Sequence, residues 1–315
     1  STKGWIPVSD DAVTDAPVQP PTQRALFAFG YDASNGISLK NLVASNGVIG
    51  SDVTGVGTGR QTLAAAGYGI DKAIFAYGLS GGDTYVSLKN LVSNSGVVAA
   101  DVTGVGTARV GLAAGTYGGD KAIFGYGQID GGAKSSLTNL VGNTGTVASD
   151  VSGVGNPRSG LAAATYGGDK VVFAYGRQTV GGASMTAVKN LVNNVGTVAA
   201  DVTGVGTGRQ QLAAASYGGD KAVFAYGTTG SVVSLKNLVS NVGIVAADVS
   251  GVGSARFGLA ASGYGGDKAV FAYGFTSERV SLKNLVSNTG IVAADVTGVG
   301  TARWFLAAAG YSTSA

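Results

Sequence analysis

The sequence contains no cysteine and no histidine. Without cysteine, disulfides, zinc–thiolate sites and cysteine nucleophiles are all excluded. Without histidine, the chain lacks the most common general base and the most common transition-metal ligand. We therefore expect no cofactor and no metal.

Charge is also scarce. Only 12% of the residues are charged and the net charge is +3, whereas globular domains usually carry about 25% charged residues. Nucleic-acid binders show clustered lysine and arginine, which this chain lacks, so no nucleic-acid partner is expected. No apolar run reaches the about 18 residues of a membrane-crossing helix, so no membrane span is expected.

Glycine is abundant, with 54 residues, and it punctuates an internal repeat. The motif Asp-Val-Thr/Ser-Gly-Val-Gly occurs six times, with spacings of 49, 49, 51, 47 and 47 residues between the aspartates. These anchor aspartates are Asp52, Asp101, Asp150, Asp201, Asp248 and Asp295. A period near 50 is typical of a four-stranded propeller blade and is too long for one rung of a β-solenoid.

Each repeat is predicted to supply four short strands. In the fifth repeat these are residues 212–217, 221–226, 232–239 and 244–249. The Gly-Gly-Asp sequence between the first two is a hairpin signal, because glycine reaches positive φ without a Cβ clash. The first run is rich in alanine, a weak strand former, which indicates an inner strand where space is short.

One copy of the repeat is split between the two ends of the chain. Its second strand opens the folded part at 24–30, and its first strand closes the chain at 303–311. Pairing these ends would leave no long strand edge open. The sequence thus predicts an all-β fold: a six-bladed β-propeller over 24–315, with four antiparallel strands per blade and the ring closed by this pairing.

Residues 1–23 have no counterpart in the repeats and hold four of the five prolines. They form either a disordered leader or an extended attachment arm. The apolar group Trp5, Ile6, Pro7 and Val8 favours an arm, since apolar arms commonly dock on a partner surface. The expected partners of this arm are other proteins or copies of the chain itself.

The repeat resembles the kelch family of propellers. The matching elements are an arginine before the inner strand (Arg209), the small-residue strand 212–215, a Gly-Gly turn, the aromatic strand 224–227 and Asp248. The repeats are also similar to those of structural and tail-associated proteins of tailed bacteriophages. That second resemblance implies a virion or extracellular location.

Comparing the six copies separates positions that serve the repeat from positions that are free to vary. An arginine, an asparagine and the anchor aspartate recur in every copy; the arginines are Arg60, Arg109, Arg158, Arg209, Arg256 and Arg303. One interpretation is structural: these residues satisfy turns and link blades. The alternative is a ring of arginines that binds an anion.

Variation is concentrated at two places, the connection between the second and third strands and the residue after each arginine. Strand alternation predicts that both lie on one face, which we interpret as a recognition surface, although drift of unconstrained loops would give the same pattern. The candidate ligand-binding residues are aromatic (Phe257, Trp304, Phe305) or hydrogen-bonding (Gln61, Gln210, Arg177, Arg279).

We expect no enzymatic activity. Glycosidases need a pair of placed carboxylates, and Asp83, Asp130 and Glu278 of the variable loops belong to different repeats. The expected function is a non-enzymatic structural or recognition component of an extracellular or virion assembly, attached or polymerised through residues 1–23, with a cell-surface glycan as a candidate partner. The alternative is a soluble, lectin-like carbohydrate-binding propeller.

Overall fold

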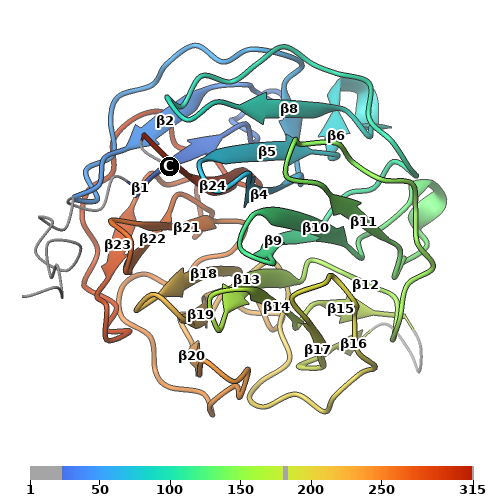
Figure 1. Ribbon diagram of the computed structural model, residues 1–315. Coiled ribbons are helices and arrows are strands. Elements are labelled where there is room, and N and C mark those ends of the chain that lie inside the picture. The colour runs from blue at the N-terminus through green and yellow to red at the C-terminus, as the bar shows by residue number, and fades with distance from the viewer. Residues whose placement is uncertain (1–22, 180–183, 314–315) are drawn as a thin grey trace, which may run out of the picture.

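The computed structural model describes residues 23–179 and 184–313 (Figure 1). Within these ranges the fold is all-β, and its only helices are two 3-10 turns, η2 (Gly81–Asp83) and η3 (Asp130–Gly132). The strands form antiparallel, three-stranded sheets. No described helix has the length and apolar character needed to cross a bilayer.

Each repeat forms one principal sheet with its second strand in the centre. In the fifth repeat, β19 (Lys221–Ala225) lies between β18 (Ala213–Tyr217) and β20 (Lys236–Val239). The equivalent sets are β4 (Ala64–Tyr68), β5 (Lys72–Ala76), β8 (Lys89–Val92); β9 (Ala113–Tyr117), β10 (Lys121–Gly125), β11 (Thr138–Val141); β13 (Ala162–Tyr166), β14 (Lys170–Ala174), β17 (Lys189–Val192); and β21 (Ala260–Tyr264), β22 (Lys268–Ala272), β23 (Lys283–Val286).

The two ends of the chain share the remaining principal sheet. β1 (Gln23–Ala28) pairs with β2 (Lys40–Val43) on one side and with β24 (Ala307–Ser312) on the other. The predicted pairing of the split repeat is therefore confirmed. β1 begins at Gln23, one residue before the expected start of the folded part.

The prediction of a regular fourth strand is wrong. In the fifth repeat, residues 244–249 contact β20 only through two isolated bridges, Val239↔Val245 and Lys236↔Val249. The bridges are three residues apart on β20 and four apart on the other run, so one extra residue bulges out and interrupts the ladder. The side chain of Asn237 donates to the Ala246 carbonyl at 3.0 Å beside this bulge. The third strand is also shorter than predicted, because Val232 bridges to Thr228 instead.

The core lies between neighbouring sheets. The first strands contact one another in a cyclic order, from β4 through β9, β13, β18, β21 and β24 back to β4. Alternate residues of each first strand are buried, whereas the second strands are buried on both faces. Aromatic side chains bridge adjacent sheets, as in the edge-to-face pair of Tyr226 and Phe271, whose ring centres are 5.5 Å apart. Alanine suits the first strands because these converge.

A second set of small pairings joins the variable segments. β3 (Arg60–Gln61) pairs with β6 (Leu79–Ser80), which pairs with β7 (Thr84–Tyr85). β12 (Arg158–Ser159), β15 (Arg177–Gln178) and β16 (Ser184–Met185) repeat this arrangement, and the other repeats keep it as isolated bridges. The residue after each arginine therefore lies beside the second-to-third connection, as predicted. We call this end of the molecule the loop face and the end with the Gly-Gly-Asp turns the turn face.

Candidate functional site

The repeated arginines are structural groups. Arg209 is fully buried, with 0% exposure. Its Nη2 donates to Asn237 Oδ1 at 2.7 Å, and its Nη1 lies 3.7 Å from Asp248 Oδ1. Its guanidinium carbon lies 4.2 Å from the ring centre of Tyr175, which belongs to the preceding repeat. The other five arginines are equally buried, so the geometry favours the structural interpretation over a solvent-facing anion ring.

The anchor aspartates complete this network. Asp248 Oδ2 accepts hydrogen bonds from the backbone N–H and the hydroxyl of Thr207, at 2.8 and 2.6 Å. Burial raises the pKa of Asp248, but the hydrogen bonds from Thr207 and Asn237 and the charge of Arg209 outweigh it and hold the pKa below its ordinary value of 3.8. The same balance lowers the pKa of four other anchors, Asp52, Asp101, Asp150 and Asp295.

A collar of backbone hydrogen bonds encircles the centre of the loop face. Its six residues each donate their N–H to the carbonyl of the preceding member, over distances of 2.6 to 2.9 Å, and the last bond returns to the first residue. Every member has a positive φ between 54° and 64°. The collar consists of Thr62, Gly111, Gly160, Gln211, Gly258 and Phe305. Three members carry side chains despite this left-handed backbone, a strain that clusters at functional sites.

The collar borders a cavity of about 300 Å³, which we call the loop-face cavity. The leucines that follow the collar residues also line it: Leu63, Leu112, Leu161, Leu212, Leu259 and Leu306. Three predicted site residues reach this cavity, namely Arg177, Gln210 and Phe305. Gln128 and Lys134 line it as well. Sequence reasoning missed these two, although they occupy a connection already identified as variable.

A cluster of aromatic rings packs around Phe305. The ring of Trp304 stacks on Phe305 with centres 4.1 Å apart and an interplanar angle of 22°, and Phe257 meets Trp304 edge-on at 5.3 Å. A Cβ at Gly258 would lie 3.2 Å from Phe305 Cδ1, so this collar glycine leaves room for the ring. Trp304 and Phe257 therefore position Phe305 but do not themselves line the cavity. The Trp304 Nε1 atom is buried and has no hydrogen-bond partner among the described residues.

Two predicted site residues lie elsewhere on the loop face. Gln61 pairs with Leu79 in the small sheet. The Arg279 guanidinium carbon lies 5.4 Å from the ring centre of Tyr31. Its charge also contributes to the lowered pKa of Asp32, although the hydrogen bond from the Ser34 backbone contributes most. Neither Gln61 nor Arg279 lines the loop-face cavity.

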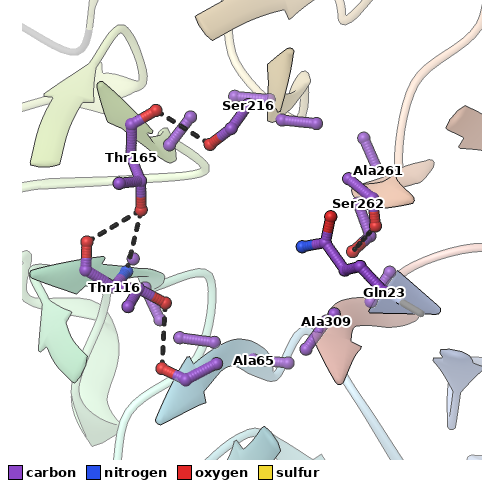
Figure 2. A pocket seen from close by; sticks show the side chains of 18 of the residues that line it. Gln23, Ala65, Thr116, Thr165, Ser216, Ala261, Ser262 and Ala309 are labelled. Atoms are coloured by element: carbon purple, nitrogen blue, oxygen red, sulfur yellow. Dashed lines mark hydrogen bonds between the residues drawn. The ribbon is translucent and has the colours of Figure 1, made fainter. Parts of the chain in front are cut away.

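A second cavity, of about 270 Å³, lies between the first strands toward the turn face (Figure 2). Hydroxyl groups here join neighbouring strands: Thr165 Oγ1 donates to the Thr116 carbonyl and Ser216 Oγ to the Thr165 carbonyl, both at 2.8 Å. The side chain of Gln23 extends into the same space in Figure 2, and its Oε1 accepts from the Gly266 N–H at 3.0 Å. Small neutral side chains dominate this lining, and their hydroxyls bond within the protein.

The acids of the variable loops do not gather. Asp83 and Asp130 lie in η2 and η3, and Glu278 lies in the loop between Phe275 and Arg279. Within residues 23–179 and 184–313, no three acidic, cysteine or histidine residues form a group able to hold a metal ion. The predicted arm residues Trp5, Ile6, Pro7 and Val8 lie outside the described residues.

No protein-family model matches the sequence, and none of the curated proteins compared with it is a significant match. The function must therefore be inferred from the site itself.

Proposed function

We propose that the six principal sheets form a closed six-bladed β-propeller of the kelch type. Three observations support closure. The first strands contact one another in cyclic order, β24 pairs with β1, and the collar returns to its starting residue. Such closure leaves no long edge strand and makes the molecule a rigid platform for loops.

We propose that this platform is a non-enzymatic recognition module that binds through the loop-face cavity. The observation that carries the proposal is the lining of this cavity. The residues that hold the sheets together are nearly the same in every repeat, whereas the residues around this cavity differ between repeats: the collar position alone holds Thr62, Gln211, Phe305 or a glycine. Arg177 and Gln210 line the cavity from two further variable positions. A ligand therefore meets an asymmetric surface at the centre of a repetitive scaffold.

We further propose that the module belongs to an extracellular or virion assembly and attaches, or polymerises, through residues 1–23. The resemblance to tail-associated repeats and the apolar group around Trp5 support this role. The second candidate is a soluble lectin-like protein that acts alone. The aromatic side chain of Phe305 and the amide of Gln210, which line the same cavity, favour it, because carbohydrate binding needs an apolar surface and hydrogen-bonding groups.

Mass determination and negative-stain imaging of the full chain and of residues 23–315 test the assembly role. The shorter chain keeps Gln23, which pairs with Ser312 in the shared sheet. We expect the full chain to form polymers, or to bind a partner, and the shorter chain to be a monomeric disc. Two monomeric discs, with glycan binding intact in the shorter chain, would contradict the assembly role and favour the lectin.

A further inference from the structure

Charge is distributed unevenly around the loop-face cavity. Lys134 and Arg177 line it from the third and fourth repeats, whereas Phe305 lines it from the repeat that joins the chain ends. No aspartate or glutamate of the described chain lines this cavity. One part of the wall is therefore cationic and another is aromatic.

The Lys134 ammonium is hydrogen-bonded, and no carboxylate in the described part of the chain forms an ion pair with it. It donates a hydrogen bond to Gln128 Oε1, and Gln128 Nε2 in turn donates to the Tyr85 hydroxyl at 3.0 Å. A lysine has three donors, so two remain for a ligand. Burial, and secondarily the positive charge of Arg177, lower the pKa of Lys134. The charge that acts on Lys134 is thus of like sign.

Arg177 adds a second unpaired cation. Its side chain is exposed at the start of β15, and no carboxylate in residues 23–179 or 184–313 lies within 4.0 Å of it. Two cations without a partner repel each other, and an anion placed between them relieves that repulsion. Ion pairs with a bound carboxylate would also be charge-assisted hydrogen bonds, which are roughly twice as strong as neutral ones.

The remaining lining favours a sugar ring as the carrier of this anion. Amides of Gln128, Gln210 and Gln211 can both donate to and accept from hydroxyl groups. Phe305 lines the cavity with an aromatic ring, one face of which is stacked on Trp304. A volume of about 300 Å³ is at the small end of ligand sites, which suits one ring rather than a long chain.

We propose that the loop-face cavity binds a carbohydrate carrying a carboxylate, with the carboxylate between Lys134 and Arg177 and the apolar face of the sugar on Phe305. This inference rests on the proposed recognition function and names the ligand class of that same cavity. It further implies that binding weakens as ionic strength rises, because the ligand charge is screened.

Isothermal titration calorimetry with the full chain tests the proposal. The probes are N-acetylneuraminate and glucuronate as acidic sugars, glucose as a neutral sugar, and inorganic phosphate as an anion without a ring. We expect at least one acidic sugar to bind at least tenfold more tightly than glucose or phosphate. Lys134→Gln and Arg177→Gln should each weaken that binding about tenfold, the effect of losing roughly 1.4 kcal/mol. Lys121→Gln is the matched control, because it removes the same charge from a turn-face pair with Asp120.

The Phe305→Gly variant distinguishes failure of the proposed recognition function from failure of the acidic-sugar inference. Glycine suits the positive φ of this position and already occupies three collar positions, so the fold should persist, and the melting temperature checks this. If glucose binds as tightly as the acidic sugars and Phe305→Gly abolishes both, the acidic-sugar inference is wrong and the recognition function stands. Equal binding of phosphate, or no binding by any probe, also overturns the inference. Unchanged binding in Phe305→Gly with a bound sugar would overturn the use of this cavity altogether.

Discussion

Replacing Asp248 by alanine should destabilise the protein strongly, although the residue does not line the loop-face cavity. The substitution removes the acceptor of three hydrogen bonds, two from Thr207 and one from Asn237. It also removes the carboxylate 3.7 Å from Arg209, whose side chain has 0% exposure. The buried guanidinium then retains its charge without a counter-ion.

Breaking a buried ion pair by removing one partner costs about 3 to 5 kcal/mol. Arg209 keeps its hydrogen bond to Asn237, and the Asp248 side chain is 23% exposed. Both facts place the expected loss at the lower end, about 3 kcal/mol. Adding Arg209→Met to the variant should recover part of this loss, because an apolar side chain of similar length needs no counter-ion.

Urea denaturation, followed by circular dichroism, measures the free energy of unfolding. The control is Asp220→Ala in the same repeat, because Asp220 and its partner Lys221 are 39% and 44% exposed at the turn face. Exposed pairs of this kind contribute little. An Asp248→Ala variant no less stable than Asp220→Ala would refute the interpretation of the arginine network as a structural element.

The network of arginines, asparagines and anchor aspartates also predicts how stability depends on pH. Repeats that depart from the common pattern offer sites for stabilising substitutions. Five anchor aspartates have a pKa below the ordinary 3.8 in the folded protein, so their contribution is present above the unfolded pKa and is lost as pH falls through the lower folded pKa. Thermal melting should therefore show constant stability above about pH 5 and a steep fall below pH 4; a flat profile would contradict this sign. Asn156 stands where the other repeats have threonine or serine and gives Asp201 only a backbone hydrogen bond at 3.0 Å. Asn156→Thr should add a hydroxyl bond and about 1 kcal/mol of stability, visible as a higher urea midpoint with unchanged m-value. Thr138 stands where the other repeats have a lysine. That lysine donates a hydrogen bond to the next repeat, as Lys189 does to the Gly243 carbonyl at 2.8 Å. Thr138→Lys should raise the melting temperature by supplying this bond, whereas Thr138→Met, which lacks the donor, should not.

Much of the fold could be predicted from the sequence because the repeat allows each copy to be compared with five others. The hairpin of the first two strands follows from a local signal, glycine between two apolar runs. Pairing of the chain ends was predictable from the number of strands at each end, because each end holds a strand of the repeat that the other lacks. β1 and β24 do pair. The structural role of Arg209 and Asp248 was also predictable, because a residue that is identical in every repeat is expected to stabilise the structure that all repeats share.

The fourth run could not be predicted as it is, because its bulge depends on tertiary contact. Its run of apolar residues, Ile244 to Ala247, beginning with two β-branched side chains, is typical of a strand. The interruption arises only where Asn237 bonds to the Ala246 carbonyl and to Asp248, so that one extra residue is accommodated beside β20. Local pattern carries no information on such a side-chain bond.

The repeat number, the hairpins, the split copy and the end of the molecule with the variable segments all follow from the order of residues, because they depend on periodicity and local backbone preference. Which variable residues meet follows from the folding of the whole chain. It brought Lys134 and Arg177 from different repeats to the same cavity as Phe305, and it left Gln61 and Arg279 outside it. The reason is that a position in the repeat does not by itself fix access to the cavity: Gln61 and Gln210 both directly follow the repeated arginine, yet only Gln210 lines it. The packing of the variable side chains around the collar decides which of them reach the cavity.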